Sequence, residues 1–158
     1  MQHFGKHSKS EVAGKVIQWL IEEGLPVSQY KDDQADINIA TRQGNVNINI
    51  GFHKDSIDSL IVIGKLHFEE QKQSMFRYTR TKREMLYDLE LSFLQMNLDF
   101  ILNVNNEQQE FTIEDINLQK IIYFDGLSKD KLFNVMSAIF NCLKVLGLKF
   151  QLLGRQRI

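Results

Sequence analysis

The stretch EEQKQSMFRYTRTKREMLYDLELSFLQMNL, residues 69–98, contains neither glycine nor proline, and its apolar spacing predicts one long helix in the middle of the chain. At 100° per residue its apolar side chains fall on two adjacent stripes, with only a narrow polar strip left over. One stripe consists mainly of Met75, Leu86, Leu89, Phe93 and Met96, and the other of Phe76, Tyr87, Leu91, Leu94 and Leu98. One sheet face cannot cover both stripes, so we expect a second cover from another helix or from a partner subunit.

Segments on both sides of this helix alternate between apolar and polar residues with a period of two, which is typical of half-buried strands. Before the helix, the alternation predicts strands at 35–39, 46–52 and 60–68. Gly44-Asn45 lies between the first two and favours a tight hairpin. After the helix, a strand is expected at 100–104, a return strand from residue 111, and a further strand within 116–124.

Two more helices are expected near the ends of the chain. Ser8 followed by Glu11 is a capping-box pattern, and Gly24 with Pro26 ends the helix that it begins. Ser128 is a candidate N-cap for a last helix over 129–146, which Gly147 would end. The tail 148–153 alternates weakly and would dock as a short strand.

These elements follow one another as a helix, three strands, the long helix, two or three strands and a last helix. Runs of strands joined by hairpins predict an antiparallel sheet with helices packed on it, which is the α+β class. The sequence has no linker rich in proline, glycine or serine and no internal repeat, so residues 1–158 are expected to form a single domain.

The element order, with Trp19-Leu20 and Glu22-Glu23-Gly24 at the end of the first helix, resembles the fold of class I type III secretion chaperones and of related uncharacterised prokaryotic proteins, including archaeal ones. The resemblance implies an α-β-β-β-α-β-β-α unit with a strongly bent antiparallel sheet, frequent homodimerisation, and a binding rather than a catalytic role. The chain departs from effector chaperones because it lacks their strongly acidic charge. No functional residue is carried over, since no functional motif is matched.

Composition indicates a globular chain without a strong electrostatic field. Of the residues, 43% are hydrophobic and 25% are charged, and the formal net charge is −1. The single Cys142 excludes an intrachain disulfide and fits a reducing compartment. The polar start of the chain is not a signal peptide, and no apolar run approaches the length of a spanning helix, so we expect a cytoplasmic protein without a membrane partner.

No catalytic, metal or cofactor site is predicted. His3 and His7 have helical spacing but no carboxylate at a matching offset, and a zinc site needs three or four ordered ligands. Cys142 lies in an apolar helix and is expected to be a core side chain. No nucleophile elbow, P-loop or dinucleotide motif occurs. We therefore expect a protein that is not an enzyme.

A basic segment lies at the start of the long helix. Arg77, Arg80, Lys82 and Arg83 alternate with Phe76 and Tyr78 and could hold phosphates, with the rings as stacking surfaces. The basic side chains spread over more than half of the helix circumference, however, and Glu84 and Asp88 can pair with them. A solvated charged face is the simpler interpretation, and weak nucleic-acid binding is the alternative.

The apolar excess is the stronger functional signal. The stripe Tyr87, Leu91, Leu94 and Leu98 and the sheet face that carries Ile61 and Ile63 are candidate interfaces, since monomers seldom expose a contiguous apolar patch of that size. Cover by the first or the last helix of the same chain would explain the stripe equally well. The leading hypothesis is a homodimeric or protein-binding module, chaperone-like in character, that needs no cofactor.

Overall fold

The computed structural model describes residues 8–44, 46–67, 87–88, 90–95, 97–105 and 112–155. It divides into two compact units, each built from two separate stretches of chain. Unit 1 contains residues 1–64 and 119–140, and unit 2 contains residues 65–118 and 141–158. The predicted α+β class with an antiparallel sheet is confirmed.

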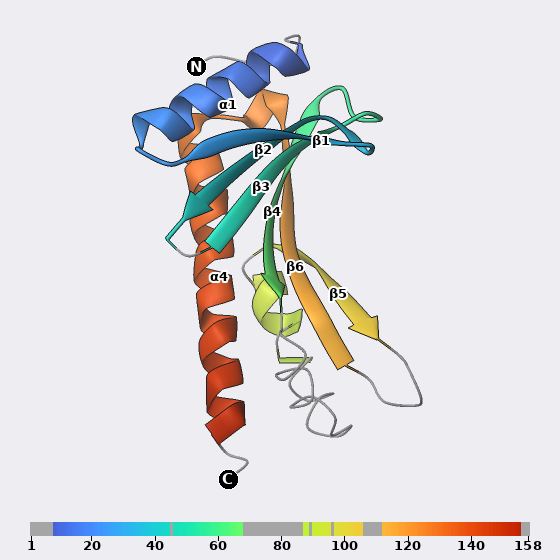
Figure 1. The fold of residues 1–158 in the computed structure, drawn as a ribbon, viewed down its shortest axis with the longest axis vertical. Coiled ribbons are helices and arrows are strands. Elements are labelled where there is room, and N and C mark those ends of the chain that lie inside the picture. Colours follow the sequence, from blue (N-terminus) through green and yellow to red (C-terminus); the bar gives the residue numbers. More distant parts are fainter. Residues whose placement is uncertain are drawn as a thin grey trace. The chain divides into compact units, whose positions relative to one another are not determined.

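The described strands form a six-stranded sheet in the order β1-β2-β3-β4-β6-β5 (Figure 1). The first three pairs of neighbours in this order are antiparallel. The last strand in sequence, β6, therefore lies beside β4 and not at the edge. The bounds are β1 Val27–Asp32, β2 Ala35–Gln43, β3 Val46–His53, β4 Ser59–His67, β5 Asp99–Asn105 and β6 Thr112–Tyr123.

Helix α1 spans Lys9–Glu22 and begins where the capping box predicts. The Ser8 Oγ accepts a hydrogen bond from the Glu11 N–H, which satisfies one of the free donors of the first turn. Gly24, with φ of 72°, ends the helix in the left-handed conformation that glycine adopts without strain. The buried side chains of α1 are Val12, Ala13, Val16 and Leu20, and this stripe packs on β1 and β2.

Among the first four strands, the sequence predicts the β2–β3 hairpin but not strand β1. The β2–β3 hairpin is confirmed: Gln43 pairs with Val46, and Gly44 has φ of 61°. Strand β1 was not predicted, because Val27–Asp32 has five exposed positions and only one half-buried one. The edge strand buries too little to need apolar alternation, and its pairing with β2 supplies the backbone hydrogen bonds instead.

The core of unit 1 forms on one face of this sheet. Alternate residues of β3 are fully buried and face the same way, and the ring of Phe52 lies 6.1 Å from that of Phe124 in the short 3-10 helix η3, Phe124–Gly126. Helix α4 begins directly after η3, with the Ser128 Oγ accepting from the Lys131 N–H as predicted. The fully buried side chains around this centre include Ile39, Ile48, Ile50, Leu60, Leu132, Met136 and Ile139.

Unit 2 contains a short helical segment that falls at the end of the predicted central helix. Residues 87, 88 and 90–95 are helical, in agreement with the prediction, while 69–86 lie outside the described residues. The Phe93 ring is buried and lies 5.2 Å from the Phe100 ring at the start of β5. The predicted strands after residue 111 are one continuous strand, β6.

Helix α4 spans Lys129–Arg155, so two sequence predictions about the C-terminus are wrong. The helix does not end at Gly147, and the tail 148–153 is helical, not a strand. A single glycine costs only about 1 kcal/mol within a helix, which packing of the surrounding turns can offset.

By length and composition the part Lys129–Leu148 of α4 meets the requirement for a membrane span. Buried core side chains account for part of this apolar content.

Cys142 lies within this helix and is buried, as predicted. Burial raises the pKa of its thiol, since the charged thiolate loses its hydration there. The residue therefore has the environment of a core side chain and not of a reactive thiol.

An ion-pair cluster joins the end of α1 to the start of α4 within unit 1. The Lys129 Nζ lies 3.1 Å from Glu22 Oε2 and 2.9 Å from Glu23 Oε1. The hydrogen bond from Lys129, with a second one from Gln18, holds the pKa of the Glu22 carboxyl below its ordinary value of 4.5. A carboxyl with a lowered pKa stabilises the folded chain above the unfolded-state pKa, and that stabilisation is lost as the pH falls through the folded-state value.

We expect Lys129→Met to raise the pKa of Glu22 back toward 4.5, because the substitution removes its main hydrogen-bond donor. Carboxyl carbon chemical shifts followed by NMR from pH 7 to pH 2.5 measure this pKa directly. Lys131→Met, an exposed change two residues along the same helix, is the control and should leave the Glu22 titration unchanged. Equal titration curves for wild type and Lys129→Met would contradict the ion pair.

Candidate functional site

Three large apolar side chains form an exposed stripe on the helical segment of unit 2. Tyr87, Leu91 and Leu94 are spaced by four and three residues and are 64%, 58% and 68% exposed. This spacing places them on one side of the helix, while Phe93 faces the opposite way and is buried. We name Tyr87, Leu91 and Leu94 the helical stripe.

Leu98 was predicted to extend this stripe, but the structure separates it from the other three. The helix ends before Asn97, which adopts a left-handed conformation with φ of 56°. The Leu98 N–H donates to the Phe93 carbonyl at 3.1 Å, which is the bond that closes a Schellman motif. This reversal of the chain buries Leu98, which is only 3% exposed.

The second half of α4, also in unit 2, exposes two further apolar side chains. Val145 and Leu148 are about half exposed and lie three residues apart, on one side of the helix. Unit 2 therefore contributes five of the large exposed hydrophobic residues in the described part of the chain, two from this helix and three from the helical stripe.

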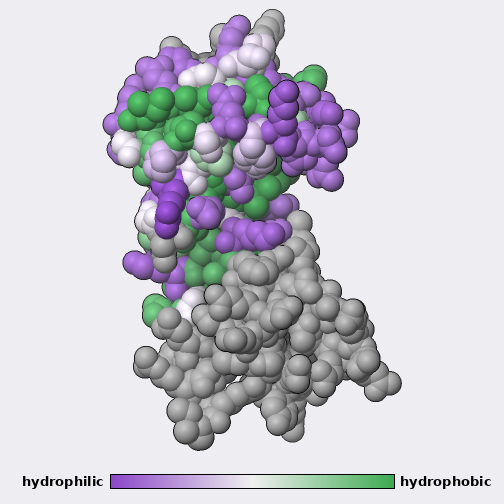
Figure 2. Space-filling model, viewed as in Figure 1, coloured by the Kyte–Doolittle hydropathy of each residue, from purple (hydrophilic) through white to green (hydrophobic). Residues whose placement is uncertain are grey.

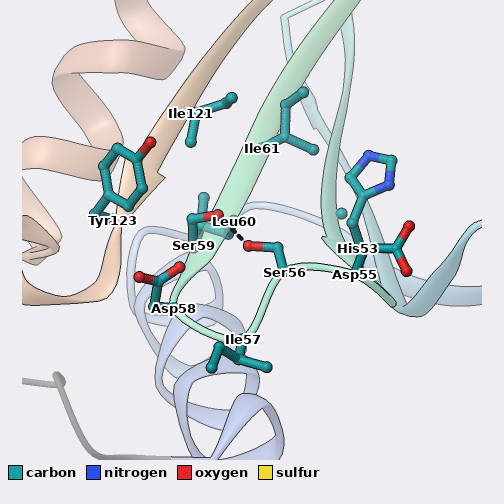
Figure 3. A pocket seen from close by; sticks show the side chains of 11 residues that line it. His53, Asp55, Ser56, Ile57, Asp58, Ser59, Leu60, Ile61, Ile121 and Tyr123 are labelled. Atoms are coloured by element: carbon teal, nitrogen blue, oxygen red, sulfur yellow. Dashed lines mark hydrogen bonds between the residues drawn. The ribbon is translucent and has the colours of Figure 1, made fainter.

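Unit 1 contains a separate feature, a pocket with a volume of about 460 Å³. It lies where β3, β4 and β6 meet the loop between β3 and β4 (Figure 3). A volume of this size is within the range of small-molecule and side-chain binding pockets. The lining residues are Gly51, His53, Asp55, Ser56, Ile57, Asp58, Ser59, Leu60, Ile61, Ile121 and Tyr123.

The floor of the pocket is an apolar patch of the sheet. Gly51 pairs with Ile61 across β3 and β4, and both lie on the face opposite to the buried Phe52. Figure 3 shows Ile121 of β6 next to Ile61, with Tyr123 of the same strand on the far side of Ile121. A Cβ atom on Gly51 would meet the Asn38 Oδ1 and the Ile61 Cγ2 at 3.4 Å, so a side chain at this position would be in contact with both neighbours.

The floor has a polar neighbour in Asn38, which is only 6% exposed. Among the described residues, none accepts a hydrogen bond from its Nδ2. A buried donor without an acceptor is uncommon in folded proteins. Asn38 lies beside Gly51 but is not among the residues that line the pocket.

The loop that forms the wall of the pocket is held in place at several points. The hydroxyls of Ser56 and Ser59 are hydrogen bonded to each other, and the Ser56 N–H donates to the His53 carbonyl at 3.2 Å. The Phe124 N–H donates to the Asp58 carbonyl at 2.7 Å. The Lys9 ammonium of α1 donates to the carbonyl of His53. These hydrogen bonds hold the wall in a defined arrangement.

The sequence-predicted candidates are distributed unevenly over these two surfaces. Ile61 lines the pocket, whereas Ile63, two residues further along β4, is half-buried and does not line it. The face that Figure 2 shows carries both hydrophilic and apolar side chains in its coloured part.

The four basic candidates Arg77, Arg80, Lys82 and Arg83 lie outside the described residues, so nucleic-acid binding stays a prediction.

Sequence reasoning missed most of the pocket. His53–Ser59 is recognisable as a polar loop between two strands, but no local pattern links it to Ile121 and Tyr123, which lie more than sixty residues later. They meet because β6 is inserted beside β4.

Within the described residues, histidine, cysteine, aspartate and glutamate side chains form no group of three that could hold a metal ion.

A family model described as an uncharacterized conserved protein (DUF2299) matches residues 12–150 of the chain. No curated protein matches the sequence. The matched range extends from the first buried residue of α1 into the second half of α4, so it includes both the helical stripe and the pocket.

Two solved structures have a similar fold. A crystal structure of an uncharacterized protein from Methanothermobacter thermautotrophicus aligns with a TM-score of 0.76 at 20% identity, over 87% of this chain and 95% of that one. YbjN from E. coli, described as a candidate transcription regulator, aligns with a TM-score of 0.50 at 8% identity, over 87% and 89%. The expected likeness to uncharacterised prokaryotic proteins is confirmed, while the likeness to type III secretion chaperones stays a prediction.

Proposed function

Since the chain belongs to the family of uncharacterized conserved proteins DUF2299, whose description assigns no activity, we propose from its geometry that it is a non-catalytic protein-binding module that associates with a second copy of itself. The observation that carries this proposal is the helical stripe. Three large apolar side chains, each more than half exposed, lie on one side of a helix, and removing them from water favours association.

The helix itself supports an interface role. Phe93, on its opposite side, is buried and contacts the Phe100 ring, so the stripe is presented by an element that is anchored within its own unit. Anchored apolar and aromatic side chains lose little conformational entropy when they are covered, and tyrosine is enriched among the residues that dominate interface energies. Val145 and Leu148 on α4 add exposed apolar area to the same unit.

A non-catalytic role is proposed because the pocket residues form a structural network rather than a reactive one. The two serine hydroxyls that line the pocket bond to each other, and the backbone N–H groups of Ser56 and Lys54 donate to backbone carbonyls. In this arrangement neither serine is paired with a base that would activate it.

The test is the mass of the chain in solution as a function of concentration, measured by light scattering coupled to size exclusion. We expect wild type to associate and Leu91→Lys with Leu94→Lys to weaken association by about tenfold or more per substitution, since each loses about 1.4 kcal/mol or more of apolar contact. Lysine is chosen because it is a good helix former and suits the last turn of a helix.

Gln95→Lys is the matched control, because it adds the same charge to an exposed position of the same helix beside the stripe. It should leave the mass unchanged. A wild-type chain that stays monomeric at high concentration, or a double variant that associates as strongly as wild type, would reject the self-association proposed here.

A further inference from the structure

We propose that the pocket of unit 1 binds a basic side chain, arginine or lysine, presented by a peptide segment of a protein partner. This inference deepens the protein-binding role proposed above and rests on it. It concerns a surface distinct from the helical stripe, and three observations on the pocket lead to it.

The first observation is the charge of the lining. Of the described residues that line the pocket, Asp55 and Asp58 are acidic, and neither lysine nor arginine is among them. Both aspartates are exposed, and Figure 3 shows them on either side of the Ser56–Ser59 pair. Two carboxylates at the rim of a hollow favour a cation over an anion of the same size.

Two lysines belong to or contact the wall, Lys54 in the loop and Lys9 of α1, and neither lines the pocket. The Lys9 ammonium, which donates to the His53 carbonyl behind the wall, also forms an ion pair with Asp36 Oδ2 at 3.0 Å. Its positive charge is therefore matched by a carboxylate that does not line the pocket.

The second observation is the apolar floor. Ile61, Ile121 and Tyr123 offer aliphatic surface and one aromatic ring beneath the acidic rim. Arginine and lysine combine an aliphatic stem with a cationic head, so the stem can cover the isoleucines while the head reaches the rim. A cation near the Tyr123 ring gains a further attraction from the ring face. A simple metal ion would make no use of this floor.

The third observation concerns Gly51, which lines the pocket and has no side chain. A Cβ atom there would meet the Asn38 Oδ1 and the Ile61 Cγ2 at 3.4 Å, so this part of the floor is narrow. A narrow floor suits the slim aliphatic stem of arginine or lysine. The protein-binding role proposed above makes a peptide segment the carrier of that side chain.

The test is titration of the full-length, isotope-labelled chain with three short capped peptides, Gly-Arg-Gly, Gly-Lys-Gly and Gly-citrulline-Gly, followed by backbone amide shifts at pH 7.5. Citrulline has the shape of arginine without its charge. We expect the Arg and Lys peptides to shift the amides of Gly51, Ser56 and Ile61, and the citrulline peptide to bind about tenfold more weakly.

Three variants locate the effect. Asp55→Asn and Asp58→Asn should each weaken the Arg peptide by about twofold to fivefold, as expected for exposed ion pairs. Gly51→Ala should also weaken it, because the added methyl group occupies the floor at ordinary contact distance and without a positive φ. Asp33→Asn, an exposed aspartate in the β1–β2 turn, is the control and should change nothing.

Equal affinity for the Arg and citrulline peptides, shifts confined to other residues, or no shifts at millimolar peptide would overturn the proposal. These results are independent of the self-association test. A chain that fails to bind the peptides can still associate through the helical stripe, and a monomeric chain can still bind them.

Discussion

Phe52→Ala is expected to destabilise unit 1 by about 3 to 5 kcal/mol, the usual cost of removing a fully buried phenylalanine side chain. The ring lies at the centre of the core, 6.1 Å from the Phe124 ring of η3. Its removal leaves a cavity between β3 and the segment that starts α4, and the neighbouring strands cannot collapse into it without breaking their pairing. A loss of this size is a large fraction of the stability of an ordinary domain.

Urea unfolding followed by the fluorescence of Trp19 measures this effect, because Trp19 is the only tryptophan and lies on α1 within unit 1. Phe52→Leu is the matched control. It keeps most of the apolar volume and should cost clearly less than the alanine variant. A change of under about 1 kcal/mol for Phe52→Ala would show that the ring is not at the core of unit 1.

The second large effect is expected at Leu20, where α1 packs on the sheet. Leu20→Ala should lower the free energy of unfolding by about 2 to 5 kcal/mol, since the side chain is fully buried. The Leu20 carbonyl also accepts from the Leu25 N–H at 3.0 Å, but this backbone bond is retained in the variant, so the effect reports side-chain packing alone.

Ile21→Ala provides the control for Leu20→Ala on the neighbouring residue. Ile21 is 61% exposed, so its truncation should change stability by no more than about 0.5 kcal/mol. The same urea transition measures both variants. Similar losses for the two would mean that α1 does not present the Val12, Val16 and Leu20 side to the sheet.

Local sequence signals proved reliable where one short-range physical rule decides the structure. The caps at Ser8 and Ser128 were predicted because a hydroxyl satisfies a free N–H within three residues. The β2–β3 hairpin was predicted because Gly44 tolerates a positive φ and apolar residues alternate on both sides. The burial of Cys142 was predicted because the surrounding helix is apolar.

The errors occurred where packing overrides a local signal. Gly147 was expected to end α4, but the helix continues to Arg155, because a glycine only weakens a helix that neighbouring turns hold in place. Strand β1 was overlooked, because an exposed edge strand needs backbone pairing and not an apolar pattern. Leu98 has the correct helical spacing for the stripe, yet the chain reverses at Asn97 and buries it.

The sequence by itself determined the α+β class, most of the strands, the ends of the first helix and the apolar excess at Tyr87, Leu91 and Leu94, because each depends on residues that are close together along the chain. Only the tertiary structure decided the pocket. Its floor and wall come from β3, the following loop, β4 and β6, and they meet because β6 is inserted beside β4. Strand order depends on which apolar faces can be buried together, and that choice leaves no signal in local spacing.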